Sequence, residues 1–278
     1  MLVEKNVSEL LHWVKERESV RIKKEAGEPK PWTTDPIIRD YKFCNVRRND
    51  DRVSRWIHDH WLHPYANHPS ITFAMCVARI FNWPETLELI EDLVFHETWQ
   101  PEEMRKRIKE YRDQGNKVFT GAYTVSTCGL AMDKVDYVID KVFTPLRKTI
   151  TNPKEGQTLE EVWEDLCQYQ GFSSFMAGQV VADLKYIKPL LHATDWNTFA
   201  PLGPGSIRGL NRLHGRELGY NVKQQQGTQE LLEIQSIIKR ELSLDIALHD
   251  VQNVHCETDK YLRLKYDNGK VRSKYPGR

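Results

Sequence analysis

The sequence of 278 residues has no long apolar run, no signal-peptide pattern and few cysteines. No run approaches the length of a membrane span, which argues against a transmembrane segment. Glu4, Lys5 and Glu9 interrupt the apolar N-terminus, so a signal-peptide core is absent. The cysteines lack CxxC and Cys/His ligand spacing, which argues against a disulfide framework and a structural zinc; they are Cys44, Cys76, Cys128, Cys167 and Cys256. We therefore expect reduced thiols in a soluble, cytoplasmic protein.

The sequence also lacks an excess of charge of one sign. Lysine and arginine number 40 and the acidic residues 39, so any nucleic-acid site must be a local patch. No GxxxxGK[ST] loop and no Rossmann glycine pattern is present, which excludes an ordinary P-loop kinase step by this sequence alone. The length nevertheless allows a substantial buried core.

Alternating strand patterns are scarce, whereas helical periodicity dominates and predicts an all-α fold. Apolar residues recur at helical spacing within 7–14, 135–142, 177–184 and 231–242. Thr158 and Glu161 predict a capping box, and Pro101 predicts a helix start that Gly115 ends. Prolines predict an extended strap over 25–40, and 219–227 is expected to be an exposed loop. We expect one helical domain over 1–278, with lobes of about 1–150 and 151–278 and a cleft between them.

The loop Leu202 to Arg208 combines glycines, a helix start and a cation. Gly203 and Gly205 can take positive φ, and Ser206 is a natural N-cap. A helix N-terminus with free amides suits an anion such as phosphate. Two interpretations stand, namely the hairpin of a helix-hairpin-helix DNA-binding element and an ordinary turn between helices.

Arginine is concentrated between residues 41 and 56. Helical spacing would place Arg48, Arg52 and Arg55 on one face, with Asp51 near enough to orient one of them. Several guanidinium groups on one face can bind phosphate through paired hydrogen bonds. The alternative is a solvated helix face with ion pairs.

Two further polar segments are candidate sites. The stretch 118–127 is rich in hydroxyls around Gly121 and Tyr123, which suits either a base-binding pocket or a structural turn. Helical spacing also places Asp250, Asn253 and Glu257 on one stripe. Such a group beside apolar residues indicates a site, although a solvated polar helix end is the alternative.

Several motifs together resemble a family of bacteriophage proteins. They are FCNVRR at 43–48, DRV at 51–53, NWPETL at 82–87, FTGAY at 119–123, LGPGS at 202–206, DVQN at 250–253, CE at 256–257 and DKY at 259–261. The chain resembles the thymine-hypermodification proteins described as α-glutamyl/putrescinyl thymine pyrophosphorylases, or amino acid:DNA transferases. The resemblance runs from about Glu16 to the C-terminus and covers the helical domain that related phage proteins fuse to a 5-hydroxymethyluracil DNA kinase.

The resemblance implies a fold and a reaction. The family is similar to all-helical DNA glycosylases with a helix-hairpin-helix, here at 202–206, and a following aspartate, here Asp250. The implied catalytic domain acts on 5-pyrophosphoryloxymethyl-deoxyuridine in double-stranded DNA, in the host cytoplasm during infection. Pyrophosphate leaves, with a divalent metal as a candidate aid, and an amino acid or polyamine takes its place. A phage base kinase is the implied partner protein, and no membrane is involved.

The resemblance also implies residue roles. Cations would stabilise the leaving pyrophosphate, for which the candidates are Arg47, Arg48, Arg52, Arg55 and Lys260, with Arg52 favoured. Asp250, or after it Glu257, would deprotonate the amine, beside the amides of Gln252 and Asn253. The uracil base would contact Tyr123 and Asn45. The DNA backbone would contact Gly203, Gly205, Ser206 and Arg208. The alternatives are a DNA glycosylase that uses Asp250 and a non-catalytic DNA-binding partner of the kinase.

Overall fold

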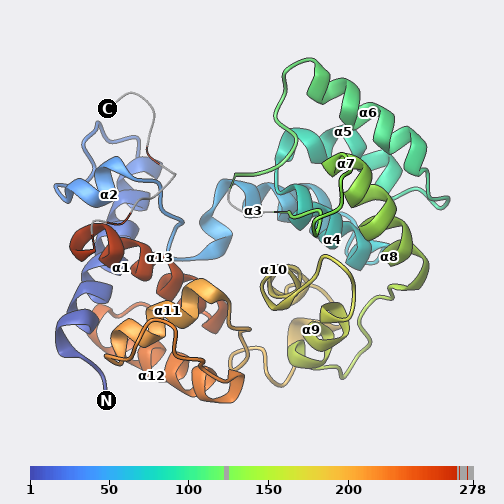
Figure 1. Cartoon of the computed structure of the whole chain (residues 1–278). Coiled ribbons are helices and arrows are strands. Elements are labelled where there is room, and N and C mark those ends of the chain that lie inside the picture. Colours follow the sequence, from blue (N-terminus) through green and yellow to red (C-terminus); the bar gives the residue numbers. More distant parts are fainter. Residues whose placement is uncertain (122–124, 268, 270–273, 275–278) are drawn as a thin grey trace. The chain divides into compact units, whose positions relative to one another are not determined.

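The computed structural model describes residues 1–121, 125–267, 269 and 274 and is mainly helical (Figure 1). No strand occurs among these residues, although an isolated bridge pairs Tyr41 with Lys274. The predicted all-α class is confirmed in this respect. None of the helices in the described ranges is long and apolar enough to cross a membrane.

The chain folds into two compact units, and the first combines both ends of the sequence. Unit 1 comprises Met1–Asp51 and Asn197–Arg278, and unit 2 comprises Arg52–Trp196. These boundaries differ from the expected division near residue 150. Periodicity along a chain shows which face of a helix is buried but not which distant helix covers that face, so it could not predict this arrangement.

Unit 1 is built around its last helix, α13. Its helices are α1 (Glu4–Glu25), α2 (Pro36–Asp40), the 3-10 helix η1 (Arg48–Asp50), α11 (Pro204–Leu213), α12 (Gln224–Leu242) and α13 (Leu248–Tyr266). Helices α1 and α13, from opposite ends of the sequence, lie side by side (Figure 1). Their shared core contains Leu10, Trp13, Val14, Leu210, Leu231, Ile234 and Val254.

The contact between α11 and α13 depends on two glycines. A Cβ atom on Gly205 would lie 2.3 Å from the Sγ atom of Cys256, and one on Gly209 would lie 2.3 Å from the carbonyl oxygen of His255. The absent side chains therefore let the two helices approach closely. The expected positive φ is not found, because Gly203 has φ −111° and Gly205 lies inside α11.

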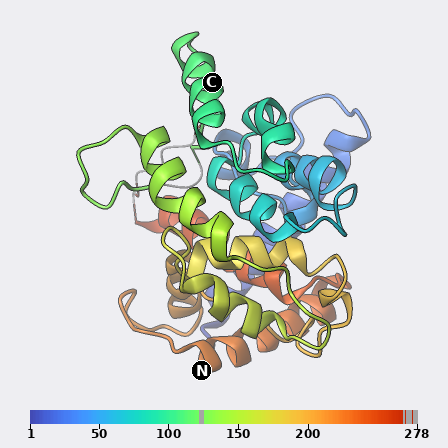
Figure 2. The ribbon, with the colours of Figure 1, turned by 90° about the vertical axis from the view of Figure 1, so that its right-hand side faces the viewer.

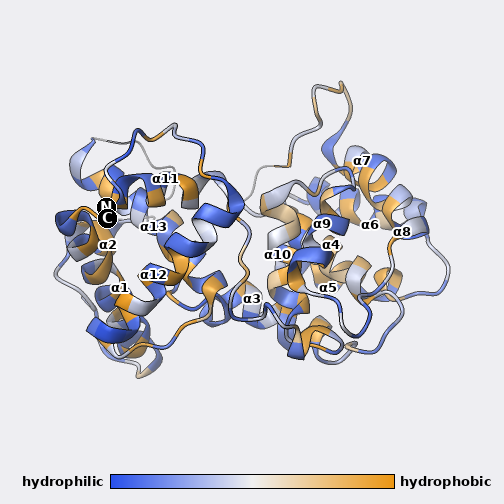
Figure 3. Ribbon diagram, turned by 90° about the horizontal axis from the view of Figure 1, so that it is seen from below, coloured by the Kyte–Doolittle hydropathy of each residue, from blue (hydrophilic) through white to orange (hydrophobic). Residues whose placement is uncertain are grey.

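Unit 2 surrounds the helix α4, in which every residue is buried. Its helices are α3 (Arg52–Ile57), the π-helix η2 (His58–Leu62), α4 (Ile71–Phe81), α5 (Pro84–Val94), α6 (Pro101–Asp113), α7 (Lys134–Tyr137), the π-helix η3 (Val138–Phe143), α8 (Thr144–Thr149), α9 (Leu159–Cys167), α10 (Ser174–Leu184) and the 3-10 helix η4 (Leu190–His192). Helices α7, η3 and α8 follow one another without a break, so residues 134–149 form one continuous helix (Figure 2). Hydrophobic and hydrophilic residues alternate along the helices of both units (Figure 3).

Local sequence signals predicted several helix ends correctly. The capping box of Thr158 and Glu161 opens α9, and Pro101 opens α6, which ends shortly before Gly115 at φ +87°. Two loop predictions were too long. Pro36 begins α2 because the Asp35 carboxylate caps its first turn, and α12 begins at Gln224, before the expected end of the 219–227 loop.

Candidate functional site

The arginine-rich segment is not the single helix that its spacing predicted. Arg48 belongs to the 3-10 helix η1, the backbone at Asp51 is extended with ψ 135°, and α3 begins anew at Arg52. Arg47 and Arg48 lie in unit 1, whereas Arg52 and Arg55 lie in unit 2. The predicted common helical face is therefore wrong, because the chain turns between η1 and α3.

Two carboxylates of α13 hold this segment through its backbone. Asp250 accepts hydrogen bonds from the amide of Arg48 at 2.9 Å and from the amide of Ala247 at 3.2 Å. Glu257 accepts one from the amide of Cys44 at 3.1 Å. Each of these two acidic residues is only 8% exposed, so the alternative of a solvated helix end is wrong. The predicted stripe of Asp250, Asn253 and Glu257 thus contacts the backbone of the arginine-rich segment.

Cations satisfy the carbonyl groups of the same segment. Arg17 of α1 donates to the carbonyl of Cys44 at 3.1 Å and to the side-chain oxygen of Asn45 at 2.8 Å. Lys260 of α13 donates to the carbonyl of Lys42 and lies 3.4 Å from Glu257. We call residues 42–51 together with Arg17, Asp250, Glu257 and Lys260 the 42–51 cluster.

Asp51, for which the sequence suggested only the orientation of an arginine, is a further candidate for a catalytic role. The pKa of this half-buried carboxyl is raised to about 6, chiefly by burial and to a smaller extent by the negative charge of Glu257. The amide of Asn45, which donates to Asp51 at 2.9 Å, and the charges of Arg48 and Arg17 lower it. A carboxylate that titrates near neutrality inside a polar cluster is typical of a functional site. The sequence could not predict this role, because the raised pKa depends on the burial of Asp51 and no local sequence pattern shows that burial.

The amide side chains take different places. Asn45 donates to the carbonyl of Asp50 at 2.9 Å, and Asn253 donates to the carbonyl of Asn45 at 3.4 Å, so both belong beside the 42–51 cluster. Gln252 instead donates to the hydroxyl of Ser206 at 3.2 Å, at the start of α11. The structure therefore separates Gln252 from its predicted neighbours.

The loop at 202–206 is mainly a structural helix start. The buried Ser206 hydroxyl accepts from the amide of Gly203 at 3.0 Å and donates to its carbonyl at 2.9 Å. Arg208 is 40% exposed and shares the buried carboxylate of Asp259 with Arg212. Residues 193–203 before α11 form no helix, so two helices do not directly flank this loop. Contact with DNA stays a prediction, and Arg208 is its best-placed member.

The remaining predicted residues belong to unit 2. The Arg52 side chain is 70% exposed and lies 3.7 Å from Glu85, and Arg55 is also exposed. Tyr123 lies outside the described residues. Across the part of the chain that the structure describes, no group of three or more histidine, cysteine, aspartate or glutamate side chains is placed to hold a metal ion.

Unit 2 contains buried charges that sequence patterns did not reveal. Arg79 pairs with Asp183, and both side chains are at most 1% exposed. Arg79 also donates to Ser54 at 3.2 Å and to Asn82 at 3.1 Å, while His58 lies 3.1 Å from Asp183. These residues form the Arg79 network, which links α3, α4 and α10.

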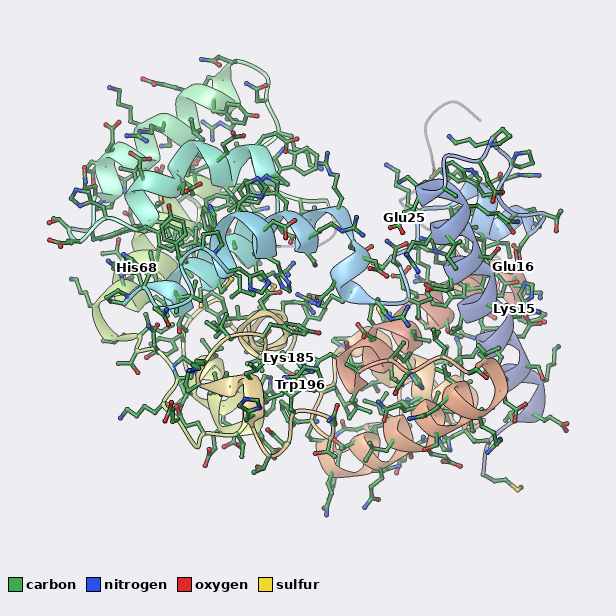
Figure 4. The ribbon with its side chains drawn as sticks, turned by 180° about the vertical axis from the view of Figure 1, so that it is seen from behind. Lys15, Glu16, Glu25, His68, Lys185 and Trp196 are labelled. Carbon is green, nitrogen blue, oxygen red and sulfur yellow. The ribbon has the colours of Figure 1, made fainter. Side chains whose placement is uncertain are left out.

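Another buried cation lies near the end of unit 2. The ammonium of Lys185 donates to the carbonyl of Trp196 at 3.1 Å and lies 3.5 Å from the centre of its ring (Figure 4). Lys185 follows α10 directly, whereas Trp196 is the last residue of the unit. This contact fastens the segment after α10.

Comparisons with known proteins place the chain in a family. The model of the helical domain of 5-hmdU DNA kinase matches residues 4–271. The 5-hmdU DNA kinase of Bacillus phage SP10 is 28% identical over 208 residues, which cover 66% of this chain and 32% of that protein. The chain thus spans about a third of the length of this curated relative. No solved structure matches. The chain belongs to the family of the 5-hmdU DNA kinase helical domain.

Proposed function

We propose that the chain modifies thymine-derived bases in phage DNA by replacing the pyrophosphate of 5-pyrophosphoryloxymethyl-deoxyuridine with an amine. Membership in the 5-hmdU DNA kinase helical-domain family supports a role on such DNA. The observation that carries the proposed chemistry is Asp51, whose pKa is raised to about 6 in the 42–51 cluster.

The reaction transfers one proton and breaks one carbon–oxygen bond. The amine nitrogen attacks the exocyclic methylene carbon, and the electron pair of the broken bond leaves with pyrophosphate. The nitrogen then carries one proton too many, and Asp51 accepts it as general base. Asp51 suits this role better than Asp250, because both oxygens of Asp250 already accept backbone hydrogen bonds.

The leaving pyrophosphate needs positive charge. Arg48 lies close enough to lower the pKa of Asp51, and its guanidinium is our first candidate for this role. Arg47 is the second, since its side chain is 34% exposed and pairs with Glu18 at 2.9 Å. Lys260 is engaged with the carbonyl of Lys42, so we assign it to holding the segment.

The experiment uses duplex DNA that contains the pyrophosphorylated base, together with glycine, serine, glutamate or putrescine. After digestion, mass spectrometry of the nucleosides should reveal an amine-bearing thymidine. Abasic DNA would instead indicate a glycosylase, and unchanged DNA with tight binding would indicate a DNA-binding partner of the kinase. Either result would overturn the transferase proposal.

Replacing Asp51 tests its role as the base. Asp51→Asn keeps an oxygen for the Asn45 amide but should lower turnover by about 10²- to 10⁴-fold while DNA affinity is retained. The control is Asp245→Asn, since that side chain is 78% exposed, and it should behave as wild type. Equal loss of turnover and DNA affinity in Asp51→Asn would make Asp51 structural.

The pKa of Asp51 also predicts two pH dependences. Turnover needs the ionised carboxylate of Asp51. The value of kcat/KM should therefore rise with increasing pH, with an apparent pKa of about 6. Because folding raises this pKa, the stability that protonated Asp51 contributes is complete below about pH 4 and is lost as the pH rises through 6. Asp51→Asn should therefore be more stable than wild type at pH 8, by roughly 3 kcal/mol, and show no gain at pH 4. Urea unfolding at both pH values measures this difference.

A further inference from the structure

Two sequence motifs that the proposed chemistry does not use lie together in unit 2. Asn82 ends α4 in the left-handed conformation, at φ 46°, and Trp83 follows before α5 begins. The Thr86 hydroxyl donates to the carbonyl of Val118 at 2.9 Å, and the amide of Thr120 donates to the carbonyl of Phe81 at 2.8 Å. These bonds fasten the segment 117–120 along the turn between α4 and α5.

Cations from α3, α7 and the segment after α6 lie over the aromatic rings of this region. The Lys117 ammonium is 3.9 Å from the centre of the Trp83 ring, and the Arg52 guanidinium is 5.9 Å from it. The Lys134 ammonium is 4.5 Å from the ring of Phe119. We call these five residues the Trp83 surface. Cations on aromatic faces, of which Arg52 and Lys117 are exposed and Lys134 is half-buried, are the composition of proteins that bind single-stranded nucleic acid.

The charge of the Trp83 surface is poorly neutralised in comparison with α6 of the same unit. On α6, Arg107 and Arg112 have carboxylate oxygens at 2.7 and 2.6 Å. The carboxylate nearest to Arg52 that forms an ion pair is Glu85, at 3.7 Å. Neither Lys117 nor Lys134 forms an ion pair with any residue that the structure describes. The Trp83 surface therefore retains positive charge for an anionic partner.

The Arg79 network gives the turn a rigid support. Arg79 donates to the side-chain oxygen of Asn82 at 3.1 Å and to the hydroxyl of Ser54 in α3 at 3.2 Å. It thus connects the residue before Trp83 with the helix that carries Arg52. Because the residue before Trp83 is fixed by buried hydrogen bonds, Trp83 should lose little conformational freedom when a ligand binds.

We propose that the Trp83 surface binds an unpaired stretch of DNA, with a base stacked on Trp83 and phosphates paired with Arg52 and Lys117. Lys117 would move from the ring to a phosphate, so that the ring face becomes available to the base. The Trp83 surface is separate from the 42–51 cluster. This inference shares with the proposed function only the assumption that the protein binds DNA. Unpaired DNA offers flat bases to the indole and backbone phosphates to the cations, whereas an acidic peptide matches only the cations.

The test measures binding of a fluorescent 15-residue oligothymidylate to the full chain by anisotropy, at several salt concentrations. Trp83→Ala should weaken binding by roughly 5- to 100-fold, and Trp83→Phe should keep most of the affinity. Lys117→Gln should lower the slope of log affinity against log salt by about 0.7, because one phosphate contact is lost. Lys106→Gln, an exposed cation of α6, is the matched control and should leave the slope unchanged.

Wild-type affinity in Trp83→Ala, or an unchanged salt slope in Lys117→Gln, would overturn the proposal. Lys117 is exposed, so its replacement remains informative even if Trp83→Ala unfolds. Turnover separates the two proposals. Trp83-dependent binding without base modification refutes the proposed function alone, whereas modification with Trp83-independent binding refutes this inference alone.

Discussion

The two units use buried charge in different ways. In unit 1, Asp250, Glu257 and Arg17 bond mainly to backbone groups of the irregular segment 42–51. In unit 2, the Arg79 network joins side chains of separate helices. Charged side chains that bond to a backbone segment can fix its conformation for ligand binding. Charged side chains that pair with each other chiefly hold helices together. We accordingly propose that the chemistry takes place in unit 1 and that the buried charges of unit 2 support a binding surface.

The largest expected effect comes from breaking the Arg79 network. Arg79→Met should lower the free energy of unfolding of unit 2 by about 3–5 kcal/mol, because the buried Asp183 carboxylate loses its arginine and keeps His58 as its neighbour. Urea unfolding followed by circular dichroism measures the loss. Arg112→Met, which removes an arginine with surface partners, should change it by less than about 1 kcal/mol. Equal effects of the two variants would remove the distinction between a network and a surface pair.

A smaller effect is expected at the contact between α11 and α13 in unit 1. Gly205→Val should cost about 1–3 kcal/mol of stability, because the new side chain meets the Sγ atom of Cys256. Gly219→Val is the control, since a Cβ there has nothing within 4 Å. Combining Gly205→Ala with Cys256→Ala should recover most of the loss of Gly205→Ala alone. Weakened DNA binding by a fully stable Gly205→Val would instead restore the DNA-backbone role predicted from the sequence.

The smallest expected effect on stability is that of Arg208→Ala. Arg212 still pairs with Asp259 at 2.8 Å, and Arg208 is 40% exposed, so the loss should stay below about 1 kcal/mol. If unit 1 contacts the DNA backbone through Arg208, duplex affinity should fall and the salt slope should decrease by about 0.9. Anisotropy with a labelled duplex measures both quantities. An unchanged slope would leave unit 2 as the main DNA-binding unit.

The helices were more predictable than the candidate site. Thr158, Glu161 and Pro101 act within one turn of chain, so their neighbours in sequence suffice to predict the helix starts. Asp250 and Glu257 were recognised because helical spacing put them on one stripe. Asp51 was not, since its raised pKa depends on burial and on Glu257, which lies 206 positions further along the chain.

The helical class, the main amphipathic segments and the motifs shared with a phage family can all be recognised in the amino-acid sequence. Tertiary structure alone decided that both ends of the chain form one unit, that the arginine run divides between two units, and that Gly205 serves helix packing. The difference arises from the distance along the chain over which each interaction acts. Periodicity and capping arise from neighbours along the chain, whereas burial, pKa and close helix contacts arise from residues that meet only after folding.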